Sequence, residues 1–98
     1  MTYILKIHES DNKQLVALCD SELLGKVFEQ NNFILDIDED FFGGDIADEK
    51  TILESIKIAH TINASGNKIV EFLLSKNIIE KSHVKTIDNV KYVIILRI

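Results

Sequence analysis

The chain has 98 residues, which is enough for one hydrophobic core and leaves no room for a second domain. Its apolar fraction of 46% and charged fraction of 28% are those of a folded globular protein rather than a disordered segment. It contains neither a membrane-length apolar run nor the pattern of a secretion signal. The single cysteine, Cys19, excludes an internal disulfide and a multi-cysteine metal site. We therefore expect one cytoplasmic domain over residues 1–98, with no membrane contact, metal or cofactor.

The net charge of −5 is unevenly distributed along the chain. Residues 1–65 hold 5 lysines and 13 acidic residues, a balance of −8, whereas residues 66–98 hold 6 basic and 3 acidic residues, a balance of +3. An acidic protein does not attract nucleic acid through its overall charge, so such a contact requires a local basic patch. Only the last third of the chain supplies the residues for one.

The pattern of the first half of the chain predicts β-strands. Residues 3–8 and 15–19 alternate apolar and polar side chains around a polar cluster at 9–12, which predicts an opening β-hairpin. Asp20 is suited to cap a short turn that ends at Gly25. Residues 33–37 alternate again and predict a third strand.

Helices are expected in the middle and a second hairpin at the end. Asp48 is a good N-cap for an amphipathic helix running to Ile62, and a second helix is expected to begin at Ser65 or Asn67. Residues 84–87 and 90–98 flank the pair Asp-Asn at 88–89, which favours a tight hairpin. The predicted order is β-β-β-α-α-β-β, an α+β fold with a mostly antiparallel sheet covered by two helices.

Two features invite a chemical interpretation but have simpler explanations. Asp36, Asp38 and Asp40 have the spacing that opens a calcium loop, but the glycine and the final glutamate of that loop are missing. Cys19 precedes a turn whose amides favour a thiolate, but it is also in phase with the apolar side of its strand. We expect an exposed acidic strand end and a buried thiol, and hence no catalytic residue.

The segment FFGG at residues 41–44 offers an aromatic ring and open backbone amides to a ligand, although it lacks the spacing of a phosphate loop. The simpler interpretation is a turn with one phenylalanine anchored in the core. Residues 48–77 and the following hairpin have the order of a winged helix-turn-helix, but the acidic first helix argues against sequence-specific DNA binding. The simpler interpretation of the basic residues in the last third is solvated lysines beside a sheet, and the functional interpretation is a modest basic face for structured RNA. Its residues are Lys68, Lys76, Lys81, Lys85, Lys91 and Arg97.

Three segments carry a resemblance to a known family. Residues 18–26 read LCDSELLGK, residues 42–44 read FGG, and residues 59–66 read AHTINASG. Together they resemble an archaeal family catalogued as domain of unknown function 424 (DUF424), over nearly the whole chain. The resemblance implies an archaeal cytoplasmic protein and brings no established activity. The family's Val-Pro-His-Ala-like C-terminal segment is replaced here by NVKYV at residues 89–93. The binding positions that the resemblance marks are Cys19, Asp20, Gly25, Gly43, Gly44, Asn63 and Gly66.

Three classes of function follow from these observations. The first is a non-enzymatic binding module that assists RNA or the ribosome. The second is a small-ligand protein or enzyme that uses a surface shared by the turn at residues 19–25 and the glycines at 43–44. The third is a protein-interaction subunit or homodimer that associates through an uncovered last strand, where Ile94, Ile95 and Ile98 are apolar.

Overall fold

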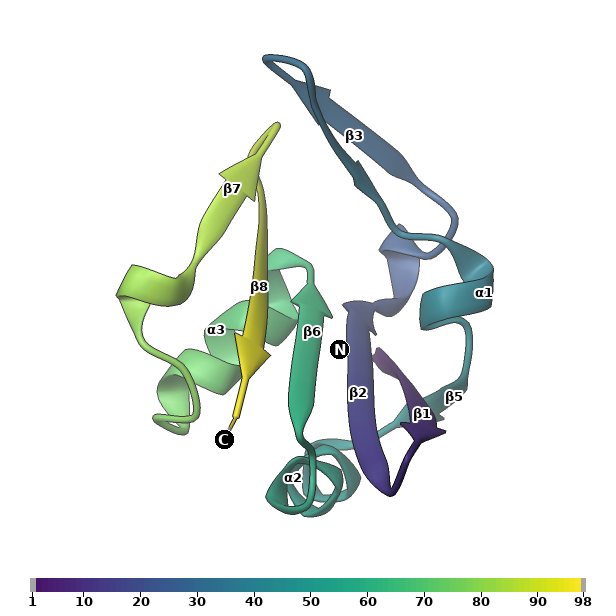
Figure 1. Ribbon diagram of the computed structural model, residues 1–98. Coiled ribbons are helices and arrows are strands. Elements are labelled where there is room, and N and C mark those ends of the chain that lie inside the picture. The colour runs from purple at the N-terminus through teal and green to yellow at the C-terminus, as the bar shows by residue number, and fades with distance from the viewer. Residues whose placement is uncertain (1, 98) are drawn as a thin grey trace.

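A computed structural model describes residues 2–97 of the chain, and Ile98 lies outside the described residues. Its main element is a six-stranded sheet with the order β5-β1-β2-β6-β8-β7, beside a separate two-stranded hairpin, β3-β4 (Figure 1). The strands are β1 (Tyr3–Ser10), β2 (Lys13–Asp20), β3 (Val27–Gln30), β4 (Phe33–Asp36), β5 (Asp45–Ala47), β6 (Thr61–Ser65), β7 (Lys85–Ile87) and β8 (Val90–Leu96). The helices are α1 (Glu39–Phe42), α2 (Glu49–Lys57) and α3 (Asn67–Ser75), with 3₁₀ turns η1 (Ser21–Leu23) and η2 (Lys81–His83).

Tight turns of one kind set the register of the antiparallel pairs. The central residues of the β1-β2, β3-β4 and β7-β8 turns are Asp-Asn, Asn-Asn and Asp-Asn, and all of them have positive φ. Two consecutive positive φ values define the type I′ turn, whose twist matches that of the flanking strands. Asn and Asp tolerate this conformation better than other non-glycine residues. By contrast, β2 and β6 run parallel, so they need a long connection through the hairpin and two helices.

The two faces of the sheet carry separate cores. On one face α2 and α3 bury aliphatic side chains such as Ile52 and Leu73, and α3 lies behind β6 and β8 in Figure 1. On the other face α1 and the β3-β4 hairpin cover only part of the sheet, around Ile4, Cys19 and Phe42. The uncovered remainder of this second face positions the candidate site.

The α+β class and the mostly antiparallel sheet are confirmed, but the order of elements differs from the prediction. The helix expected to reach Ile62 ends at Lys57, and Thr61–Ser65 forms β6 in the middle of the sheet. The strands β3 and β5 and the short helix α1 were not predicted. No helix within residues 2–97 has the length and apolar character needed to cross a membrane.

Candidate functional site

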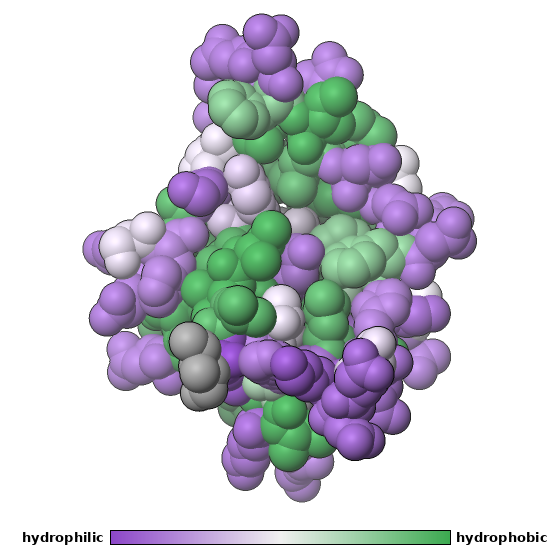
Figure 2. Space-filling view, viewed as in Figure 1, coloured by the Kyte–Doolittle hydropathy of each residue, from purple (hydrophilic) through white to green (hydrophobic). Residues whose placement is uncertain are grey.

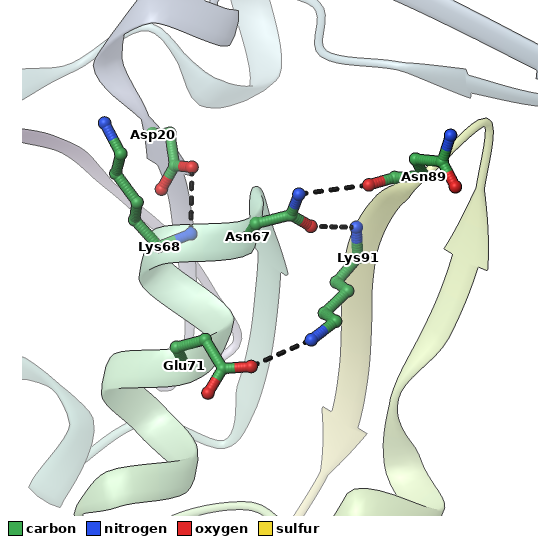
Figure 3. A network of polar contacts seen from close by, with 6 residues as sticks. All are labelled: Asp20, Asn67, Lys68, Glu71, Asn89 and Lys91. Atoms are coloured by element: carbon green, nitrogen blue, oxygen red, sulfur yellow. Dashed lines mark hydrogen bonds and ion pairs between the residues drawn. The ribbon is translucent and has the colours of Figure 1, made fainter.

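Asp20 lies at the carboxyl end of β2 and caps a helix that begins 47 residues later. Its carboxylate accepts a hydrogen bond from the backbone N–H of Lys68, at 3.1 Å (Figure 3). It accepts a second one from the backbone N–H of Ile69, at 2.8 Å. Because β2 and β6 are parallel, their carboxyl ends lie together, and α3 begins directly after β6. The expectation that this side chain caps the following turn is wrong, since η1 has no side-chain cap bond.

Gly66 makes this approach sterically feasible. Its φ is +132°, and a Cβ built on it would lie 2.4 Å from Cγ of Asp20, closer than real Cβ contacts occur. Its N–H donates to the carbonyl of Lys91, at 2.8 Å, so the residue joins β2, β8 and α3. Two of the segments that carry the family resemblance, 18–26 and 59–66, therefore meet in one structural junction.

The chemistry at this junction is that of a structural cap. Asp20 is only 3% exposed. Burial raises its pKa, and the two amide hydrogen bonds, which lower the pKa, offset burial only in part. The carboxylate is therefore enclosed by the start of α3.

Cys19 lies on the opposite face of β2 and is fully buried in the core beneath α1. Burial raises the pKa of its thiol to about 12, and the negative charge of Asp20 adds to the effect. A thiol with that pKa is protonated at neutral pH, which removes the basis for nucleophilic reactivity.

The raised pKa of Cys19 predicts a specific loss of stability at high pH. Because the fold favours the protonated thiol, this contribution is complete below the unfolded pKa of about 9 and is lost as the pH rises toward about 12. Urea denaturation of the native protein and of Cys19→Ala between pH 8 and 11 should give stability curves that converge by about 1.4 kcal/mol per pH unit above pH 9. Stability curves that stay parallel above pH 9 would contradict the raised pKa of Cys19 in the folded protein.

The glycines at 25, 43 and 44 fix the position of α1. Gly25 has φ of +85° and donates its N–H to Ile37, at 2.7 Å, while its Cβ would meet Oε1 of Glu39 at 3.2 Å. A Cβ on Gly43 would lie 2.2 Å from the carbonyl oxygen of Glu39, and one on Gly44 would lie 2.1 Å from that of Leu5. The turn at residues 19–25 and the glycine turn therefore do lie close together, on either side of α1.

The glycines hold α1 beside a groove of about 370 Å³. This groove lies between the β3-β4 hairpin and the open face of the sheet. Figure 2 shows a hollow near the centre of this face with hydrophobic residues around it. We call this feature the hairpin groove. Its lining residues are Ile34, Leu35, Asp36, Asp38, Phe41, Phe42, Asn63, Ser65, Tyr92 and Ile94.

Two polar side chains of β6 form part of the groove lining. Asn63 is half-buried, and the Oγ of Ser65 is buried without a hydrogen-bond partner among the described residues. A buried hydroxyl without a partner costs free energy, so such groups are uncommon in folded proteins. Of the seven positions that the family resemblance marked, only Asn63 lines this groove. Ser65 was interpreted as a helix boundary, and its alternation with Ile62 and Ala64 was the signal that could have placed it in a strand.

The rim of the groove is acidic and its outer walls are apolar. Asp36 is exposed, and Asp38 caps α1 by accepting the N–H of Asp40, at 3.0 Å. Ile34 and Ile94 extend large apolar side chains into solvent on either side. Among residues 2–97, no three His, Cys, Asp or Glu side chains gather as metal ligands.

Acidic or carbonyl groups lie beside three of the six predicted basic residues. Lys91 pairs with Glu71 at 2.8 Å (Figure 3), and Lys68 pairs with Glu22 at 3.6 Å. The guanidinium of Arg97 donates to the carbonyl of Ile56. Lys76 ends α3 and Lys85 lies in β7, both exposed. Asn67 holds the start of α3 against the last hairpin, donating to the carbonyl of Asn89 and accepting from the N–H of Lys91.

The fold and the groove define a small α+β protein with one partly open sheet face and a buried helix cap. The sequence profile of a family described as "Protein of unknown function (DUF424)" matches residues 8–98, and the chain belongs to that family. No curated protein matches the chain. A crystal structure of an uncharacterized conserved protein from Methanopyrus kandleri has the same fold, with a TM-score of 0.82 and 23% identity. The alignment covers 100% of this chain and 95% of that one.

Proposed function

We propose that this protein is a non-enzymatic cytoplasmic binding module that holds an extended segment of another protein in the hairpin groove. The segment presents an apolar side chain to the groove and a neighbouring lysine or arginine to its rim. The observation that carries the proposal is the combination of exposed aliphatic walls, an acidic rim and an unpartnered buried hydroxyl in one groove.

Apolar contact supplies most of the expected affinity. Ile34 and Ile94 stand on opposite walls and are both more than half exposed. Burying one aliphatic side chain of a partner between them is worth roughly 1.5–3 kcal/mol. The volume of about 370 Å³ is at the small end of ligand sites, which suits one or two side chains rather than a cofactor.

Charge gives the groove its preference for a basic partner. Asp36 and Asp38 line it, and Glu39 and Asp40 follow directly in the chain. Phe41 and Tyr92 also line it, and the face of an aromatic ring attracts a lysine or arginine cation by about 0.5–2 kcal/mol. The same carboxylates repel phosphates, which argues against RNA at this face.

RNA or ribosome association through the C-terminal basic residues is the second candidate. A hollow of about 570 Å³ between α3, η2 and β8 favours it, because Lys81 and Lys91 both line that hollow. Glu71 also lines it and pairs with Lys91, which reduces its attraction for phosphate. Binding of this kind would weaken steeply as salt increases.

Selection from a random peptide library on the immobilised protein tests the groove. We expect enriched peptides to combine an aliphatic or aromatic residue with an adjacent lysine or arginine. The double variant Asp36→Asn/Asp38→Asn should bind them about tenfold or more weakly, since two charges are lost while asparagine still caps α1.

The matched control removes two carboxylates from α2, which packs on the opposite face of the sheet. Glu49→Gln/Glu54→Gln changes the net charge equally and should leave binding within about twofold. Enrichment of acidic peptides, or equal losses in the two double variants, would contradict the proposal. Binding of structured RNA that requires Lys81 and Lys91 would favour the second candidate instead.

A further inference from the structure

Ser65 carries a hydroxyl that the fold leaves without a partner in the floor of the hairpin groove. The residue is fully buried, and its Oγ has no hydrogen-bond partner among residues 2–97. It stands in β6, in the middle of the sheet between β2 and β8, where so short a side chain does not reach solvent (Figure 1). Of the described residues only Gln14 shares this condition, at its Oε1, and that longer side chain is half-buried. The Ser65 hydroxyl therefore has the most to gain from a hydrogen bond that a ligand supplies.

Asn63 adds a second polar group on the same face of β6. Residues two apart in a strand point to the same side, and their side chains start about 6.6 Å apart. Asn63 is half-buried and lines the groove, so its carboxamide is within reach of a bound group. A carboxamide and a hydroxyl each donate and accept hydrogen bonds. The floor of the groove is therefore able to donate to a bound group and to accept from it at the same time.

The surroundings of these two side chains select against a charged group. Their neighbours on β2 are Ala17 and Cys19, which are both fully buried in the core beneath α1. Burying an ionised group among such apolar neighbours is costly, and the carboxylate of Asp36 in the rim also repels another carboxylate. The group that fits is neutral and carries its donor and its acceptor on separate atoms. A primary carboxamide has these properties.

We propose that the bound segment carries an asparagine or glutamine whose carboxamide enters the floor of the groove between Asn63 and Ser65. Its carbonyl oxygen accepts from the Ser65 hydroxyl, and its NH₂ group donates to the carboxamide oxygen of Asn63. Tyr92 stands opposite Ser65 on β8, is half-buried and lines the groove, so the carboxamide reaches the hydroxyl when the Tyr92 side chain turns aside. This inference rests on the proposed function and names a side chain that the groove selects.

The stability of a serine variant separates a ligand contact from a structural role. An unpartnered buried hydroxyl costs free energy in the free protein, so Ser65→Ala should raise the urea midpoint of unfolding. The matched control is Ser55→Ala on α2, because the Ser55 hydroxyl donates to the carbonyl of Thr51, at 3.0 Å. That variant should unfold at an equal or lower urea midpoint than the native chain. A lower midpoint for Ser65→Ala would contradict the proposal.

Two peptides that differ in one side chain test which group the groove selects. The first is acetyl-Leu-Lys-Asn-Lys-Leu-N-methylamide, in which the asparagine holds the only primary carboxamide, and the second has leucine in its place. Leucine has nearly the same shape as asparagine, so a purely apolar groove would prefer it. We expect the asparagine peptide to bind about threefold or more tightly than the leucine peptide, as measured by amide-shift titration of the full chain. Ser65→Ala should remove this preference and Ser55→Ala should retain it.

The same titrations distinguish failure of this inference from failure of the proposed function. If the leucine peptide binds, weakens in Asp36→Asn/Asp38→Asn and is not surpassed by the asparagine peptide, the groove stands and the carboxamide assignment is wrong. If neither peptide binds, both are wrong. If Ser65→Ala unfolds at a lower urea midpoint and keeps the preference for asparagine, the hydroxyl holds a buried water alone and does not contact the segment.

Discussion

Replacing Gly66 by alanine is expected to lower the free energy of unfolding by roughly 3 kcal/mol or more. The new Cβ would lie 2.4 Å from Cγ of Asp20, and φ of +132° is a conformation that other residues rarely adopt. Relief requires the carboxylate to leave the first amides of α3, so one substitution disrupts both the glycine turn and the helix cap. Urea denaturation followed by circular dichroism measures the loss.

A double-mutant cycle separates the clash from the loss of the cap. Asp20→Ala alone should cost roughly 2–4 kcal/mol, because two buried N–H groups of α3 lose their acceptor. In that background the clash is gone, so adding Gly66→Ala should cost less by about 1–3 kcal/mol. Costs that add within about 0.5 kcal/mol would show that the two residues are not coupled.

Gly25→Ala is the matched control for backbone strain. Gly25 also has a positive φ, of +85°, but its Cβ would meet only the flexible carboxyl of Glu39 at 3.2 Å. We expect a loss of about 1–2 kcal/mol there, from the conformation alone. A loss as large as that of Gly66→Ala would mean that strain rather than the Asp20 contact dominates at both positions.

Replacing Phe42 by alanine is expected to cost about 3–5 kcal/mol, the second large effect. Phe42 is 4% exposed and belongs to the core that joins α1 and β4 to the sheet, together with Ile4 and Cys19. Its loss leaves a cavity beneath α1 and removes the anchor that holds one wall of the hairpin groove. Chemical denaturation gives the cost, and amide chemical shifts along β3 and β4 report the loosened hairpin.

Phe41→Ala provides the comparison. Phe41 is half-buried, stacks on His8 with ring centroids 4.9 Å apart, and meets Phe42 edge-to-face at the same distance. Truncating it removes less buried area and should cost about 1–2 kcal/mol. If the two truncations cost the same, the anchoring role of Phe42 is wrong.

The parts of the fold predicted from the sequence are those specified by local patterns. Alternation placed β1, β2 and β4, and the pair at 88–89 placed the last hairpin. The strand β6 was not predicted, because Ile56, Ala59 and Ile62 have the three-residue spacing of a helix face. What makes residues 61–65 a strand is pairing with residues 15–19 and 92–96, and such pairing is not encoded locally.

The residues of the candidate site were also predicted only where a local pattern specified them. Asp20 and Gly66 were marked for attention, but their contact spans 46 residues and depends on the parallel pairing of β2 with β6. Cys19 was expected in the core because of its phase along the strand, and it lies there. The basic face was predicted from charge alone, which does not reveal that Glu22 and Glu71 lie beside Lys68 and Lys91.

The most direct test of the groove proposal is a nuclear magnetic resonance titration of the ¹⁵N-labelled protein with the peptide acetyl-Leu-Lys-Leu-Lys-Leu-amide. We predict that amide shifts concentrate at Ile34, Asn63, Ser65 and Ile94. We also predict that they fall strongly in Asp36→Asn/Asp38→Asn and when glutamates replace the peptide's lysines. Shifts that are absent, that survive the double variant, or that gather around α3 and β7 would contradict the account.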